Sequence, residues 1–247
     1  MNLLRPAFRK IILTSLLAIS AQSALLAQFG DSKYRFGLHF SPNYTLVTPE
    51  TRLLNREAPK LGFGYGLIME RRIGENYFFS SGLSIQQLAY SNSIDSSVFR
   101  LPSGASFKAF NPIYEYRVQY IEVPLSMKMR TNQMGAIRIF GQFGMNLGVL
   151  ARAQARVINT PDVFEPEEYF FINKVEDYRI NEELTVDDRV SLFRASVLIA
   201  GGIEYLLSGD TQMLIGLRLD NPFTDAYRGD KLSGRTPSVG LQLGILF

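Results

Sequence analysis

The sequence predicts an all-β fold, an eight-stranded antiparallel up-and-down transmembrane β-barrel with short periplasmic turns and long extracellular loops. Three observations lead to this prediction. The 247 residues include 18 Phe, 12 Tyr and 20 Gly but no Cys and no Trp, a mixture typical of strand-rich chains with close-packed backbones. Eight segments alternate apolar with polar or glycine residues, and the connections between them alternate long with short.

The first four predicted strands are apolar at every second position, as expected of strands with two different faces. The strand at about 34–41 alternates Phe, Leu and Phe with Gly, His and Ser, and the one at 61–70 alternates large apolar residues with glycines. The third, about 77–91, is less regular. In the fourth, residues 121–129 keep the alternation, whereas residues 116–120 have the opposite phase, which predicts a bulge or an aromatic lining.

The last four predicted strands, at about 137–148, 194–205, 213–220 and 238–247, are the most regular. Ten residues at about 3.3 Å each, tilted by about 45°, span roughly 23 Å, which matches the apolar band of an outer-membrane barrel. The sheet must close, because an open edge in lipid would leave backbone groups unpaired. The predicted connections are 45–60, 72–76, 92–115, 131–136, 153–192, 206–212 and 221–236.

A secreted lipocalin-like ligand-binding barrel, with its apolar face turned inward, would show the same alternation. The polar face favours the membrane barrel, because it holds Gly, Ser, Gln and Asn with sparse charges. That composition suits a crowded lumen, whereas a soluble barrel would cover this face with Lys and Glu. An eight-stranded barrel has room only for its own side chains, so we expect no open pore.

Residues 1–27 are predicted to be a secretory signal peptide that precedes a barrel domain at 28–247. Three basic residues are followed by an apolar run of about nine residues, half the length of a spanning helix, and then by small residues. We expect cleavage after Ala27, with Ser23 as the alternative site and an uncleaved anchor as the alternative to cleavage. Removal leaves 23 basic residues (26 minus 3) against 23 acidic ones. The mature chain is then neutral, which argues against nucleic-acid binding.

The polar faces direct nine charged residues toward the predicted lumen: Arg35, Lys128, Arg138, Arg194, Arg218, Glu70, Glu122, Glu204 and Asp220. Because five cations and four anions nearly balance, we expect a structural ion-pair network. An ion path or gate is the alternative, although a ring of one sign would be its signature. A chain without Cys and with one His holds neither a thiolate nor a multi-histidine metal site, and we expect no cofactor.

The single histidine, His39, is the candidate general base. An outer-membrane hydrolase would need it beside a positioned Ser or Asp at the outer rim. Ser41 lies two residues along the same strand, so the two side chains point in parallel and make a poor pair. We therefore expect a packed histidine and a protein that is not an enzyme, with the hydrolase as the alternative.

The long connection at 153–192 holds ten acidic residues without the ligand spacing of a 12-residue calcium loop. A solvated acidic loop is expected, and calcium binding stays open. An aromatic run, Tyr169, Phe170 and Phe171, lies within it and indicates partner contact or a lid over the barrel mouth. We predict a barrel whose extracellular loops contact an unknown envelope or secretion protein.

The chain resembles the small outer-membrane barrels of Gram-negative bacteria. Its last residues match the apolar alternation that is the assembly signal read in those proteins by the barrel-insertion machinery: Leu241, Leu243, Ile245 and Phe247. Residues 120–128 (YIEVPLSMK), 201–205 and 221–225 are similar to segments of the PorT-like barrels of Bacteroidetes. The resemblance implies an outer-membrane location, contact with lipid and with the insertion machinery, and a role in the cell envelope. Some members of that family belong to the type IX protein secretion system.

Overall fold

The computed structural model describes residues 33–52, 54–94, 96–100, 106–110, 113–159, 170–171, 184–186, 189–228 and 233–247. The chain divides into two units, Met1–Tyr34 and Arg35–Phe247, of which the second forms the barrel. The predicted signal peptide lies outside the described residues. Within the described ranges there is no helix long and apolar enough to span a membrane.

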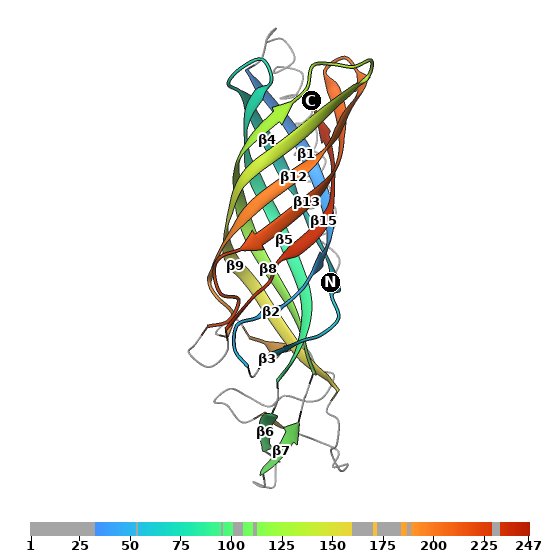
Figure 1. Cartoon of the computed structure of the whole chain (residues 1–247). Coiled ribbons are helices and arrows are strands. Elements are labelled where there is room, and N and C mark those ends of the chain that lie inside the picture. The colour runs from blue at the N-terminus through green and yellow to red at the C-terminus, as the bar shows by residue number, and fades with distance from the viewer. Residues whose placement is uncertain are drawn as a thin grey trace, which may run out of the picture. The chain divides into compact units, whose positions relative to one another are not determined.

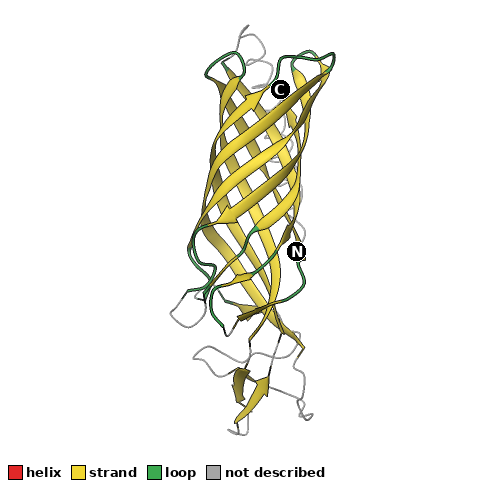
Figure 2. Ribbon diagram, in the orientation of Figure 1, coloured by secondary structure: helices red, strands yellow, loops and turns green. Residues whose placement is uncertain are grey.

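Eight antiparallel strands form the wall of a closed barrel (Figure 1; Figure 2). They are β1 (Tyr34–Thr45), β4 (Lys60–Arg72), β5 (Tyr77–Ile94), β8 (Ile113–Arg130), β9 (Ile137–Asn159), β12 (Phe193–Ser208), β13 (Thr211–Pro222) and β15 (Ser238–Leu246). Each strand pairs with its neighbours along the chain, and β15 pairs with β1, for example at Leu38 and Ile245. The predicted fold class is confirmed, and all eight predicted strands are present.

The barrel has a turn end, where short turns join the strands, and a loop end, where the four long connections lie. The tightest turn joins β12 to β13 through two residues, whereas seven (206–212) were predicted. Gly209 permits this because its φ of 54° lies in the left-handed region that such two-residue hairpins require. The strands therefore continue closer to the turn than their side-chain pattern indicated.

The long connections contain short strands that were predicted as loops. Three pairings tie connections to one another or to the wall: β2 (Thr48–Pro49) with β14 (Gly234–Arg235), β3 (Leu54–Arg56) with β5, and β11 (Leu184–Thr185) with β9. A separate three-stranded sheet contains β6 (Ser96–Arg100), β7 (Ser106–Phe110) and β10 (Phe170–Phe171). Tyr169 and the ten acidic residues of the third connection lie outside the described residues.

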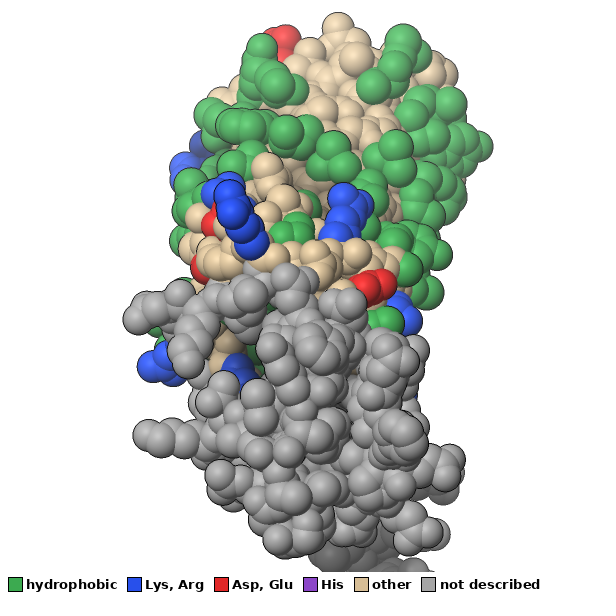
Figure 3. Space-filling model, turned by 60° about the horizontal axis from the view of Figure 1, so that its bottom comes forward, with side chains coloured by type: hydrophobic (Ala, Val, Ile, Leu, Met, Phe, Trp, Pro, Cys, Tyr) green, Lys and Arg blue, Asp and Glu red, His purple; other side chains and the backbone are tan. Residues whose placement is uncertain are grey.

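The apolar faces of the strands point away from the lumen. Leu61, Phe143 and Leu217 are about 60% exposed, whereas inward-facing polar residues such as Ser196 and Gln142 are buried. Apolar side chains accordingly cover the wall in Figure 3. This orientation excludes the lipocalin-like alternative, because in that barrel the apolar face would line the cavity.

A bulge divides the lumen into a polar part and an aromatic part. In β8 the even-numbered residues from 114 to 130 point inward throughout, so this strand does not change phase. The register shift lies beside Tyr120, where β9 contributes the extra residue Ala151. The aromatic lining is confirmed, but the bulge belongs to β9 rather than to β8. Beyond it, β9 turns Ala153 and Ala155 inward, and these small residues leave room for the tyrosines of β8.

Candidate functional site

Charged side chains from four strands meet near the turn end of the lumen. This turn-side ion cluster consists of Arg35 on β1, Glu70 on β4, Lys128 and Arg130 on β8, and Glu204 on β12. The Lys128 ammonium lies 2.8 Å from Glu70 and also pairs with Glu204. Arg130 lies 3.2 Å from Glu204, while Arg35 pairs with Glu70 and lies 3.5 Å from Glu204. Each carboxylate therefore meets at least two cations.

Two buried phenylalanines supplement the carboxylates of this cluster. The guanidinium groups of Arg35 and Arg130 lie 4.7 and 4.1 Å from the ring centre of Phe78. The Lys128 ammonium lies 4.6 Å from the ring centre of Phe140. Three cations face only two carboxylates, and the ring faces attract the excess positive charge without adding another anion.

A second group of charges, the loop-side ion cluster, contains Glu122 on β8, Arg194 on β12, and Arg218 and Asp220 on β13. Arg194 lies 2.9 Å from Glu122. Arg218 lies 2.7 Å from Asp220 and 4.0 Å from Glu122. Asn146 donates a hydrogen bond to Asp220. All five residues are buried, and the two cations balance the two carboxylates.

Eight of the nine predicted lumen charges lie in these two clusters. The exception is Arg138, which makes no ion pair among the described residues and donates a 2.7 Å hydrogen bond to Gln133 in the adjacent turn. Arg130, which was not predicted, takes part instead. The alternation of β8 contained this signal, since Arg130 lies two residues beyond Lys128 on the same face.

His39 lies between the two clusters, in the middle of β1. A cavity of about 20 Å³ there is lined by His39 together with Glu70 of one cluster and Arg218 of the other, a volume that holds roughly one water molecule. The Ser41 hydroxyl donates a 2.7 Å hydrogen bond to the Leu241 carbonyl rather than to the imidazole. His39 is thus packed inside the barrel, and this geometry does not supply the base and nucleophile at the outer rim that a hydrolase needs.

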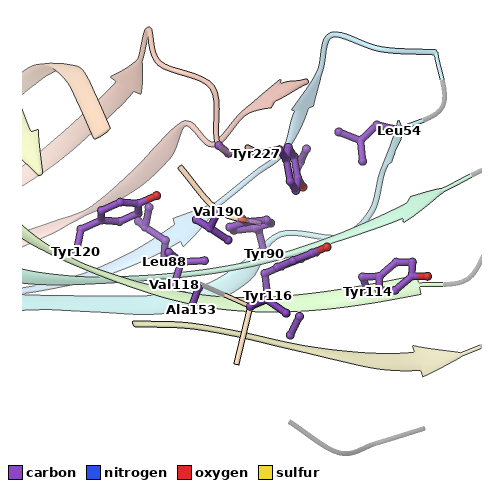
Figure 4. Packing of buried hydrophobic residues seen from close by; sticks show 14 residues of the cluster. Leu54, Leu88, Tyr90, Tyr114, Tyr116, Val118, Tyr120, Ala153, Val190 and Tyr227 are labelled. Carbon is purple, nitrogen blue, oxygen red and sulfur yellow. The ribbon is translucent and has the colours of Figure 1, made fainter. Parts of the chain in front are cut away.

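Tyrosines close the lumen at the loop end (Figure 4). The rings of Tyr90 on β5 and Tyr116 on β8 stack with centres 5.2 Å apart. Tyr227, from the connection after β13, meets both rings edge-on, and its hydroxyl donates a 3.2 Å hydrogen bond to Asn92. Burial, followed by the nearby Tyr116 and Asp225, raises the pKa of Tyr227 well above its ordinary value, so this hydroxyl stays neutral.

Residues of three long connections pack onto these tyrosines and complete what we call the apolar plug. Its members are Val47, Leu54, Leu88, Tyr90, Tyr114, Tyr116, Val118, Tyr120, Ala153, Ala155, Val186, Val190, Ala226 and Tyr227. The Tyr120 hydroxyl also donates a hydrogen bond of 3.1 Å to the Ser191 carbonyl in the third connection. The plug therefore both fills the barrel mouth and holds the bases of the loops.

The predicted assembly signal lies on the strand that closes the barrel. Leu241 and Ile245 point outward and are exposed, whereas Leu243 is partly buried and follows the buried Gln242. The backbone of Phe247 exchanges two hydrogen bonds with Phe36, of 2.8 and 3.0 Å. This residue thus extends the β1–β15 seam beyond β15 itself.

The third connection carries the predicted contact residues and the predicted acidic loop. The backbones of Phe170 and Phe171 pair with Arg100 and Phe99. In the part of the chain that the structure describes, no group of three or more His, Asp or Glu side chains is placed to hold a metal ion. The question of calcium binding concerns acidic residues outside the described ranges.

The chain matches a known family of outer-membrane β-barrel domains. A family model described as "Outer membrane protein beta-barrel domain" matches residues 21–228. No curated protein matches the chain. The solved structures to which it is similar include Neisserial surface protein A, with 10% identity, 85% of this chain and 95% of that chain covered, and a TM-score of 0.43. A second is OprG from Pseudomonas aeruginosa, with 8% identity, 86% of this chain and 95% of that chain covered, and a TM-score of 0.41. A third is Ail of Yersinia pestis, with 9% identity, 87% of this chain and 100% of that chain covered, and a TM-score of 0.35.

Proposed function

Because the chain belongs to the outer membrane protein β-barrel domain family, we propose that it is a non-enzymatic anchor that presents its extracellular loops to a partner in the cell envelope. The protein lies in the outer membrane, where its apolar wall contacts lipid. The observation that supports the proposal best is the filled lumen. Two ion clusters and the apolar plug occupy successive levels of the barrel, so the loops rather than a pore are left to act.

The charges of the lumen favour a structural role over an ion path. Each carboxylate of the two clusters is paired, and both signs are present at each level. A conducting pore needs a continuous aqueous path, and selectivity rings usually carry charge of one sign. The cavity beside His39 has room for about one water molecule and does not provide such a path.

The loop bases are held in a way that suits a contact surface. β2 and β14 join the first and fourth connections, and an ion pair of 2.6 Å between Glu50 and Arg235 reinforces that pairing. The apolar plug holds the first, third and fourth connections from inside. Loops with fixed bases lose less conformational freedom on binding, which favours recognition. We assign the contact itself to Tyr169, Phe170 and Phe171.

More specifically, we propose that the chain is a PorT-like barrel of Bacteroidetes with a role in type IX protein secretion. The support is the sequence motif at 120–128, whose Glu122 and Lys128 lie in different ion clusters. Because these two side chains help to fill the lumen, the motif supports membership of the PorT-like barrels more directly than it supports a role in secretion.

Two further proposals concern the ends of the chain. Residues 1–27 are a signal peptide that is removed in the mature protein, and N-terminal sequencing of the extracted protein should begin at Gln28. The terminal run Leu241, Leu243, Ile245 and Phe247 is the signal for the barrel-insertion machinery. Its outward apolar side chains are the feature that such machinery is expected to read.

Photocrosslinking in intact cells tests the proposed contact. A photoreactive amino acid at position 169, 170 or 171 should capture one defined envelope protein, whereas the same amino acid at Asp210, in the β12–β13 turn, should not. Removal of residues 160–183 should abolish the capture and the biological role with the barrel still folded, because the deletion stops before β11 and Val186 of the apolar plug. Equal capture from both ends, or full function without the loop, would contradict the proposal.

A further inference from the structure

The outer face of β8 and β9 changes character between the lipid-facing wall and the loops. Odd-numbered residues of β8 point outward there, and antiparallel pairing sets them opposite even-numbered residues of β9 beyond the bulge. The facing pairs are Glu115 with Arg156, Arg117 with Gln154, and Gln119 with Arg152. We call these six residues the rim patch. It contains polar side chains only.

The rim patch carries more positive than negative charge. Its one carboxylate, Glu115, accepts a 2.6 Å hydrogen bond from Arg156 and lies 3.6 Å from the ammonium of Lys60. Arg117 and Arg152 are exposed, and Arg152 makes no ion pair with any described residue. Together with Lys60, these six residues hold four cations and one carboxylate, so the patch carries a net positive charge that can attract an anion.

The height of the patch places it at the membrane surface. The last strongly exposed apolar residues on these outer faces are Ile121 and Val149. Arg117 and Arg152 follow them by four and three residues, which at about 3.3 Å per residue and about 45° tilt is roughly 7–9 Å nearer the loops. Lipid headgroups occupy roughly 5–8 Å on each side of the hydrocarbon core.

We propose that the rim patch binds the phosphate of a phosphorylated lipid headgroup in the outer leaflet. Guanidinium groups bind phosphate oxygens through two parallel hydrogen bonds, and the amides of Gln119 and Gln154 supply further donors between the arginines. The acyl chains of the same lipid would lie along the wall below Ile121 and Val149. This inference goes beyond loop contact and does not depend on which partner the loops take.

Native mass spectrometry of the folded mature protein in detergent tests the site, with lipid A, a phosphorylated glucosamine lipid, as the probe. A positive charge near an anionic lipid surface contributes about 1 kcal/mol, which is about fivefold in affinity. Arg117→Gln with Arg152→Gln should therefore weaken lipid A binding by about 25-fold. Arg152→Lys, which keeps the charge but cannot make two parallel hydrogen bonds, should bind lipid A more tightly than Arg152→Gln and less tightly than the wild type. Arg228→Gln, an exposed arginine on the fourth connection, is the matched control and should change nothing.

A variant that should bind lipid A more tightly distinguishes a loss of lipid recognition from a loss of folding. Glu115→Gln removes the competing carboxylate from Arg156 and Lys60, so lipid A should bind about fivefold more tightly. A misfolded barrel would not gain affinity, and far-UV circular dichroism confirms the fold of each variant. Unchanged binding in the folded double variant would overturn the proposal. So would equal binding of dephosphorylated lipid A, or displacement of lipid A by inorganic phosphate at equal concentration, which would indicate a site for free anions.

Discussion

The turn-side ion cluster predicts that removal of a carboxylate is more harmful than removal of a cation. Glu204 pairs with Arg35, Lys128 and Arg130, so Glu204→Gln leaves three cations, two of them buried, facing Glu70 alone. Breaking a buried ion pair from one side costs roughly 3–5 kcal/mol, because the remaining charge stays buried without compensation. Lys128→Met removes a cation and leaves two cations with two carboxylates. Its cost should stay within the ordinary range of roughly 1–3 kcal/mol.

Urea unfolding of the barrel in lipid vesicles, followed by far-UV circular dichroism, measures both free energies, since the chain has no Trp to report by fluorescence. The double variant Glu204→Gln/Lys128→Met should be more stable than Glu204→Gln alone, because it lowers the excess of cations. Glu50→Gln, at an exposed pair with Arg235, is the control and should cost less than about 1 kcal/mol. If Lys128→Met costs as much as Glu204→Gln, charge balance does not govern this cluster.

Three further predictions concern the lipid-facing wall, the β1–β15 pairing that closes the barrel, and the rim patch. Leu217→Arg on the lipid face should cost roughly 2–4 kcal/mol at mid-bilayer in the same unfolding assay, and a neutral result would contradict the outward face. Deletion of Phe247 should slow insertion, seen as unfolded chain in periplasmic fractions, because its backbone pairs with Phe36 at the closing seam; normal surface levels would argue against this. Burial raises the pKa of Glu115, but the hydrogen bond from Arg156 and the charges of Lys60, Arg156 and Arg117 together outweigh burial and lower the pKa below the ordinary 4.5. The stability that Glu115 adds should thus be complete above pH 4.5 and lost as the pH falls through the lowered pKa. The difference in the free energy of unfolding between the wild type and Glu115→Gln should therefore decrease only below pH 4.5.

The strands were predictable where each face keeps one chemical character. Along β13, for example, apolar residues meet lipid and polar residues meet the lumen, so period-two alternation gives both the strand and its orientation. Beyond the bilayer this constraint ends. β9 continues to Asn159, past its predicted end at 148, through a run of Ala, Arg and Gln in which neither face is apolar enough to show a strand. Backbone pairing with β8 extends it there.

The pairing of the lumen charges needed the register between strands, which no single segment contains. Glu122 and Lys128 lie six residues apart on one face, yet they belong to different clusters because the carboxylate partners of Lys128 come from β4 and β12. Arg138 was expected among them, but its place near the start of β9 lets it reach Gln133 in the turn.

The apolar plug was not predicted beyond an aromatic lining of β8. Besides residues of β5 and β9, its other members come from connections that are distant in the sequence, such as Leu54, Val186 and Tyr227. Each of these three lies in a polar loop, without periodicity that would mark it as buried. Only the closed barrel brings them over the same opening.

Electrical recording in planar lipid bilayers tests the central claim, that the lumen is filled and the protein works through its loops, most directly. The mature wild-type protein, reconstituted after its fold is confirmed by circular dichroism, should produce no steady conductance steps, because both ion clusters and the apolar plug block the lumen. Reproducible ohmic steps that scale with salt concentration would show a continuous aqueous path and contradict the account.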